Sequence, residues 1–283
     1  DNFNLNYSGR ANDLNFYFSH SDKNLDNFDI PDEAVIHEPG ETHEEKSFLE
    51  NSDSKMAATR IGISKTGDWG YYGISSVIID QINGVPFHGE EEEAPAPGQP
   101  EPEHERIFAV TDSSMLNIEG EYFLSGSINS INYSFRETDS TLTEQHEEEE
   151  EGGHAGEEEG TTTFTNNSEE AQIILDVSNG SNEQKIVLNI ANSDSSVVKE
   201  KGTPSMRPAD SSESTLGYYY GTNLNDFHFD LGLRFDQINV KGSLLNNNVV
   251  TNHDLDFDNL SYSFSLNRSI TDNFDATVGF SNV

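Results

Sequence analysis

Histidine and glutamate occur together in three separate stretches of this 283-residue sequence. Imidazole and carboxylate form a ligand set that suits Zn²⁺ and related divalent metals, whereas carboxylates alone suit Ca²⁺ or Mg²⁺ better. We therefore predict a divalent metal, with Zn²⁺ as the first expectation and Ca²⁺ left open for the acidic loops. The predicted metal ligands are His37, His43, His88, Glu90, Glu91, His104, His146, Glu147 and His154.

A plain alternative is that these stretches are solvated acidic loops in which the histidines are incidental. Their spacing is irregular, and glycines such as Gly152, Gly153 and Gly156 separate the candidate ligands. Such spacing does not favour a preformed tetrahedral site within one loop. The sequence instead favours weak, multivalent capture of cations, which would raise the local metal concentration above a tighter site elsewhere.

The remaining histidines, His20, His228 and His253, have no acidic run beside them. His228 alternates with Phe227 and Phe229, so we expect it on a polar face, where Asp230, Arg234 and Asp236 would serve as structural salt-bridge partners. The sequence has no Gly-x-Ser-x-Gly elbow and no His-Glu-x-x-His motif. We therefore predict that the protein is not an enzyme.

The amino-acid composition of the chain restricts the kinds of partner that it can bind. The chain carries 52 acidic and 15 basic residues, for a formal charge of −37, so it would repel the phosphates of a nucleic acid and attract cations. It has no cysteine, which removes thiol chemistry and cysteine-based zinc sites. No run approaches the roughly 18 apolar residues of a membrane helix, but that absence leaves a β-barrel open.

The elements that would position the candidate ligands are strands. Residues 227–235 alternate apolar and polar side chains, and residues 2–8, 116–124 and 260–267 do the same. This period of two places each set on one face of a sheet. We expect about twelve strands and little helix. Tiny turns alternate with long connections near residues 20–58, 80–106, 137–163, 193–214 and 241–256.

Two folds fit this alternation. A soluble sandwich would bury the apolar face, whereas a membrane barrel would turn it to lipid and the polar face to a wet lumen. Successive connections in an up-and-down sheet lie at opposite ends. Because short and long connections alternate along the chain, one end of the sheet would have only short turns, and the other would carry the long loops with every His/Glu cluster. That asymmetry, together with segments of about 9–11 residues, favours an antiparallel up-and-down transmembrane β-barrel. Its short turns would be periplasmic and its long loops extracellular.

Several motifs resemble those of TonB-dependent outer-membrane receptors of the zinc-uptake (ZnuD-like) group. Gly70–Glu93 is similar to a family strand that runs into a histidine-containing motif and an acidic loop, and His88 matches the histidine of that motif. Residues 27–31, 49–52 and 163–167 resemble neighbouring family segments in the same order. The chain departs from the family at Phe87, where a glycine is usual, and its loops are richer in glutamate.

The resemblance implies a 22-stranded barrel around an N-terminal plug, powered by the inner-membrane TonB complex. Residues 1–283 would then be part of that barrel, without the plug, the TonB contact or the last strands. The expected partners are a divalent metal ion, outer-membrane lipid and, through the missing N-terminal part, TonB, in the outer membrane of a Gram-negative bacterium. Two alternatives stay open: a receptor of this fold for a siderophore or other organic ligand, and a secreted soluble β-protein that binds calcium.

Overall fold

The computed structural model describes residues 1–31, 47–86, 106–147, 161–199, 207–246, 249–271 and 274–282, and every regular element in these ranges is a strand. The strands are β1 (Asn2–Ala11), β2 (Leu14–Leu25), β3 (Phe28–Asp29), β4 (Phe48–Leu49), β5 (Ser54–Gly67), β6 (Gly70–Gly84), β7 (Arg106–Phe123), β8 (Ser130–Glu147), β9 (Thr162–Asp176), β10 (Asn182–Lys199), β11 (Ala209–Leu224), β12 (Phe227–Asn246), β13 (Val249–Thr271) and β14 (Phe274–Asn282). The described residues include no helix that is long and apolar enough to cross a membrane.

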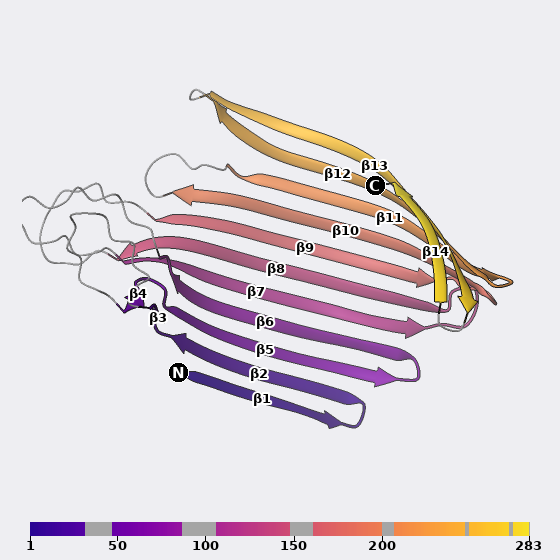
Figure 1. Cartoon of the computed structure of the whole chain (residues 1–283), viewed down its shortest axis with the longest axis horizontal. Coiled ribbons are helices and arrows are strands. Elements are labelled where there is room, and N and C mark those ends of the chain that lie inside the picture. Colours follow the sequence, from indigo (N-terminus) through magenta and orange to yellow (C-terminus); the bar gives the residue numbers. More distant parts are fainter. Residues whose placement is uncertain are drawn as a thin grey trace, which may run out of the picture.

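Twelve of these strands form one curved sheet in which each strand pairs antiparallel with its neighbour along the chain (Figure 1). The order is β1-β2-β5-β6-β7-β8-β9-β10-β11-β12-β13-β14, and the short β3–β4 pair stands apart from it. The predicted strand number and up-and-down order are confirmed. A sandwich would require two facing sheets with a core between them, so the sandwich fold is wrong for the part of the chain that the structure describes.

Tight turns join the strands at the end of the sheet that lies opposite the β3–β4 pair (Figure 1). Asn12 and Asn225 open the two-residue turns after β1 and β11 with positive φ angles of 54° and 56°. Asparagine tolerates this left-handed conformation better than most residues, so the turn chemistry agrees with the strand pattern. We call this end the turn end and the opposite one the loop end.

Several strands are longer than the pattern of the sequence predicts. Expected connections at 137–163 and 193–214 shrink, because β8 continues to Glu147 and β10 to Lys199. Residues 241–256, expected as a long connection, are mostly strand, since β12 ends at Asn246 and β13 begins at Val249. β12 and β13 have 20 and 23 residues, about twice what a tilted strand needs to cross a bilayer.

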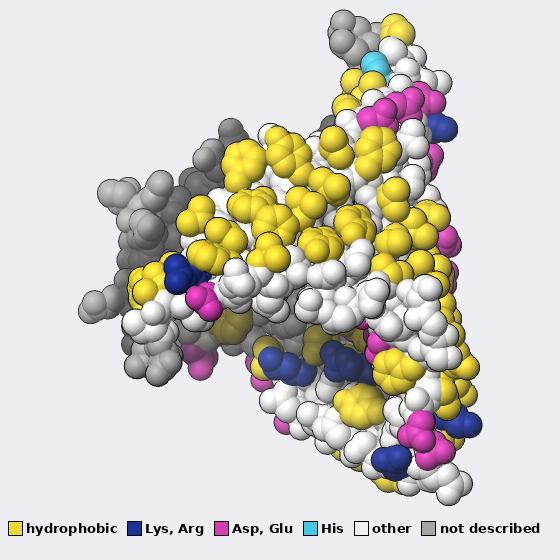
Figure 2. Space-filling model, turned by 90° about the vertical axis from the view of Figure 1, so that its right-hand side faces the viewer, with side chains coloured by type: hydrophobic (Ala, Val, Ile, Leu, Met, Phe, Trp, Pro, Cys, Tyr) yellow, Lys and Arg dark blue, Asp and Glu magenta, His cyan; other side chains and the backbone are white. Residues whose placement is uncertain are grey.

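The two faces of the sheet differ sharply towards the turn end. Cross-strand partners such as Leu188, Leu216, Phe235 and Leu260 lie on one face, where they are 44%, 52%, 44% and 61% exposed. Hydrophobic side chains form a broad patch that few charged side chains interrupt (Figure 2). The other face carries polar side chains. Apolar side chains that stay exposed in such numbers suit lipid, so we call the apolar face outer and the polar face inner.

Candidate functional site

The first His/Glu stretch, residues 32–46, leaves the sheet between β3 and β4, and its two ends are tied together. Phe28 pairs with Leu49 and Asp29 with Phe48, and the Ile30 amide donates to the Ser47 carbonyl at 2.9 Å. The segments 27–31 and 49–52, which the sequence comparison singled out separately, therefore form one unit. The structure places this unit at the loop end of the sheet (Figure 1).

Ser52 is the centre of this unit. Its Oγ accepts from the Phe28 amide at 2.8 Å and donates to the Leu49 carbonyl at 2.6 Å, while its own amide donates to Asn27 Oδ1 at 3.0 Å. Ser52 is only 7% exposed, so these bonds are shielded from water. One serine thus joins both sides of the root of the first stretch. We call the hydrogen-bonded group Asn27, Phe28, Leu49 and Ser52 the root clamp.

The second stretch, residues 87–105, starts beside this clamp. The Gly84 amide donates to the Asp53 carbonyl at 2.9 Å, and the Val85 amide donates to the Ile107 carbonyl at 2.9 Å. A Cβ atom on Gly84 would lie 2.5 Å from the Asn51 carbonyl oxygen. Only glycine allows this close approach of the two backbones. The roots of the first and second stretches are therefore packed against each other.

The third stretch begins at the end of β8, which pairs with the start of β7. Ile107 is the cross-strand partner of His146, and Arg106 is the partner of Glu147. Since the Ile107 carbonyl also binds Val85, the roots of the second and third stretches adjoin as well. All three His/Glu-rich stretches therefore leave the sheet at neighbouring positions. Sequence spacing could not show this, because the register between strands decides it.

Most predicted ligands lie outside the described residues. These are His37, His43, His88, Glu90, Glu91, His104 and His154. His146 and Glu147 form the last two positions of β8, so the expectation that they belong to a loop is wrong for their backbone. Within the described part of the chain, no group of three or more His, Asp or Glu side chains is arranged to hold a metal ion. The ligand assignment stays a prediction.

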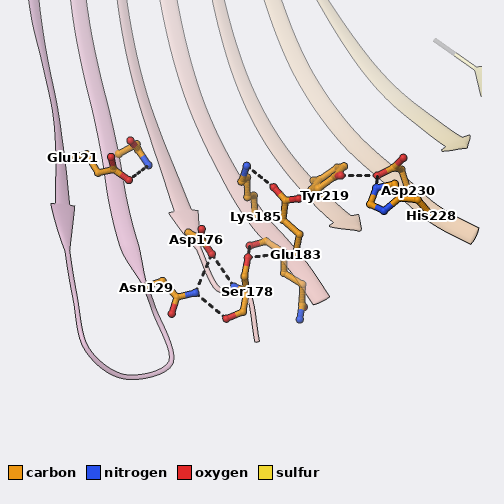
Figure 3. Close-up of polar contacts among 11 residues, drawn as sticks. Glu121, Asn129, Asp176, Ser178, Glu183, Lys185, Tyr219, His228 and Asp230 are labelled. Atoms are coloured by element: carbon orange, nitrogen blue, oxygen red, sulfur yellow. Dashed lines mark hydrogen bonds and ion pairs between the residues drawn. The ribbon is translucent and has the colours of Figure 1, made fainter. Parts of the chain in front are cut away.

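The inner face carries a polar network near the turn end, and its members come from β11, β12 and β13 (Figure 3). Asp230 accepts hydrogen bonds from Tyr219 Oη at 2.6 Å and from Ser265 Oγ at 2.7 Å, and its Oδ1 lies 3.0 Å from His228 Nε2. The other ring nitrogen of His228 lies 2.9 Å from Asn223 Oδ1. His228 is therefore a hydrogen-bonding residue of the inner wall, as its alternation with Phe227 and Phe229 predicts.

A second inner network lies further along β12. Arg234 Nε donates to Asp236 Oδ1 at 2.6 Å, and Arg234 Nη2 contacts Glu213 Oε1 at 2.9 Å. Asp236, which is 4% exposed, also accepts from Thr215 Oγ1 at 2.7 Å. The predicted roles of Asp230, Arg234 and Asp236 as structural partners are confirmed. These contacts place the Arg234 cation beside the carboxylates of Asp236 and Glu213, so the charges within the inner wall are paired.

Sequence reasoning missed a further set of polar residues at the turn end of the inner face (Figure 3). Asn129 Nδ2 donates to Asp176 Oδ1 at 3.1 Å and to the Ser178 carbonyl at 2.8 Å, and Ser178 donates its amide to Asp176 at 2.9 Å. Lys185 pairs with Glu183 at 2.8 Å. Turn residues such as Asn, Asp and Ser in short connections were the available signal. Their contacts stabilise the connections at the turn end.

The single antiparallel sheet, with its apolar outer face, polar inner wall and elaborated loop end, has the fold of the TonB-dependent outer-membrane receptor barrel. Comparison with solved structures leads to the same class. The FrpB iron transporter from Neisseria meningitidis matches with a TM-score of 0.71 at 12% identity, over 99% of this chain and 44% of that one. The predicted fold class is confirmed, and a barrel of this kind belongs in an outer membrane.

Two further solved structures match comparably. The siderophore receptor PiuA from Acinetobacter baumannii has a TM-score of 0.64 at 13% identity, over 99% of this chain and 47% of that one. The hemophore receptor HasR from Serratia marcescens has a TM-score of 0.63 at 8% identity, over 94% and 40%. The chain therefore spans less than half the length of these solved receptors. No protein-family model matches the sequence, and no curated protein does.

Proposed function

We propose that this chain is part of a TonB-dependent receptor that takes up a divalent metal, with zinc as the expected cargo. The observation that carries the proposal is the convergence of the three His/Glu-rich stretches on adjoining roots at the loop end. The plug and the TonB contact would belong to the remainder of a full-length receptor. The chain would supply the outer capture surface and part of the wall.

Charge supports cation capture at this end. Residues 32–46, 87–105 and 148–160 hold 20 of the 52 acidic residues of the chain and only one of its 15 basic residues. Such an excess of one sign raises the local concentration of counter-ions and speeds their arrival. Neighbouring roots let histidines from different stretches act on one ion, because each further ligand then binds in an intramolecular step.

The test is titration of the full chain, folded in detergent, with Zn²⁺, Ca²⁺ and Mn²⁺ by isothermal calorimetry. We expect Zn²⁺ to bind most tightly, and replacing the six stretch histidines by glutamine to weaken it at least about tenfold, because imidazole is the ligand that favours zinc. The six positions are His37, His43, His88, His104, His146 and His154.

A matched control uses the three histidines outside the stretches. His20 contacts Thr59 and His228 belongs to the inner network, so glutamine at these positions and at His253 should leave zinc binding unchanged. Zinc binding no tighter than millimolar in the unmodified chain would refute the capture role. Equal losses in the two histidine sets would refute the assignment to the stretches.

A receptor for an organic chelate is the second candidate, and one observation favours it. On the inner face near the loop end, Leu142, Phe164 and Val197 are cross-strand neighbours, and the first two are 38% and 40% exposed. An apolar surface of this kind suits an organic ligand better than a bare ion. Quenching of intrinsic fluorescence by ferric siderophores, with no response to Zn²⁺, would favour this candidate over metal-ion uptake.

A further inference from the structure

The inner face of β1, β2, β5 and β6 differs in charge from the rest of the inner wall. Lys23 pairs with Met56, and this cross-strand row continues to the inward-facing Leu142 of β8. Arg60 lies four positions after Met56 on β5, so it faces inward too. The inward positions of these four strands carry three basic residues, Arg10, Lys23 and Arg60, and no acidic residue. Lys23 and Arg60 form no ion pair with any described residue.

The described carboxylates of the inner wall lie on β7 and the strands after it. Glu119 of β7 shares a row with Ser64, which is four positions beyond Arg60 on β5. Four residues along a strand and two strand spacings across separate the two backbones by roughly 16 Å. That distance exceeds the Debye length of about 8 Å at physiological salt. Asp22 and Asp80 are nearer, but they project from the outer face, so the inward cations are not neutralised on their own side.

A buried hydroxyl without a partner lies beside one of these cations. Ser19 is the cross-strand partner of Arg60 on one side and of Asn6 on the other. Its Oγ has no hydrogen-bond partner among the described residues, although Ser19 is only 4% exposed. Such a hydroxyl costs free energy, because it has lost water without gaining a replacement. A ligand with acceptor oxygens beside Arg60 would remove that cost.

The neighbouring inward side chains add further hydrogen-bond donors. Asn4 and Asn6 are exposed on β1, and Asn6 Nδ2 donates to Asn4 Oδ1 at 3.0 Å, so Asn4 Nδ2 can donate to a ligand. Guanidinium, ammonium, hydroxyl and amide donors on one face suit an oxyanion, whose oxygens accept from all of them. We infer that the inner wall of β1, β2 and β5 binds a small oxyanion, either a phosphate or a carboxylate, through Lys23, Arg60 and Ser19.

This oxyanion site lies just below the root clamp. Leu25, two positions after Lys23, pairs with Ser54, which follows Ser52 of the clamp by two positions. A ligand that enters at the loop end therefore passes the roots of the His/Glu stretches before it reaches the site. The site uses none of the predicted metal ligands, so it does not depend on the identity of the cargo metal.

Inorganic phosphate and citrate are the probes for the full chain folded in detergent. Each is titrated by isothermal calorimetry in Tris chloride with EDTA, so that no metal bridges the anion to a carboxylate. We expect saturable binding, and phosphate and citrate separate the two oxyanion chemistries by which of them binds more tightly. The double variant Lys23→Gln and Arg60→Gln should bind at least about tenfold more weakly, because each lost charge-assisted hydrogen bond costs several-fold in affinity. Ser19→Ala should also weaken binding without lowering the free energy of unfolding, since its hydroxyl has no protein partner to lose.

A matched control removes two positive charges from the opposite face of the same strand. Lys55→Gln with Lys65→Gln changes the outer face of β5 and should leave oxyanion binding unchanged. All four substituted side chains of the two double variants are exposed, so both should fold, which circular dichroism checks. Absence of saturable binding of both anions to the unmodified chain would overturn the inference. Equal losses in the two double variants would also overturn it, because net charge would then explain the binding.

Discussion

Replacing Ser52 by alanine should open the root of the first His/Glu stretch without unfolding the sheet. The substitution removes the bond from the Phe28 amide, at 2.8 Å, and the bond to the Leu49 carbonyl, at 2.6 Å. Both backbone groups then lose their partner at a site where Ser52 itself is 7% exposed. The β3–β4 pair has only two residues in each strand, and so short a hairpin is marginal by itself.

The expected magnitude follows from these two bonds. Each contributes about 0.5–1.5 kcal/mol, so the clamp should lose about 1–3 kcal/mol of local stability. That loss raises the opening equilibrium roughly 5- to 150-fold. Ser52 lies between β4 and β5 and is not part of any strand of the twelve-stranded sheet, so the free energy of global unfolding should change little.

Amide hydrogen exchange measures the effect directly. The Ile30 amide, which donates to Ser47, should exchange faster by the same factor in Ser52→Ala, while the Thr59 amide in β5 keeps its rate. Ser114→Ala, on the outer face of β7, is the matched control. An unchanged Ile30 rate would refute the role of the root clamp, and equal acceleration at Thr59 would show that Ser52 stabilises the whole sheet instead.

Two further substitutions test contacts elsewhere. Gly84→Ala should lower the free energy of unfolding, measured in urea, by about 1–3 kcal/mol, because its Cβ would lie 2.5 Å from the backbone of Asn51. Gly62→Ala is the control and should cost little, since the nearest atom there is 3.5 Å away. Equal losses in the two variants would contradict the close approach at Gly84. Arg234→Met leaves the buried Asp236 without its cation and should cost about 1–3 kcal/mol, a range reduced because the arginine is half-exposed. Full stability after that change would show that the Arg234–Asp236 pair contributes nothing.

The strand pattern near the turn end could be predicted because it depends on local geometry. Side chains alternate between the two faces of any strand, so the sequence from Phe227 to Phe235 already shows which residues face lipid. Placing His228 and Asp230 on the inner face follows from the same rule. Short turns add independent evidence, since Asn12 and Asn225 adopt conformations that few other residues tolerate.

The strand ends could not be predicted in the same way. Beyond Phe235 the outward positions become polar, while inward Ile238 and Val240 become apolar, so the hydrophobic pattern moves to the opposite face. In the sequence alone, this shift interrupts the alternating pattern, and such an interruption looks the same as the end of a strand. Backbone hydrogen bonds to β11 and β13 do not depend on which face is apolar, so the strand continues to Asn246.

By itself, the sequence determined the fold class, the short turns and the association of the His/Glu stretches with one end of the sheet. Only the tertiary structure decided that the roots of these stretches adjoin. Asp53 and Gly84 are 31 positions apart in the sequence, yet their backbones are hydrogen-bonded at 2.9 Å. Register between strands is a long-range property, set by the pairing of whole strands, and local periodicity carries no record of it.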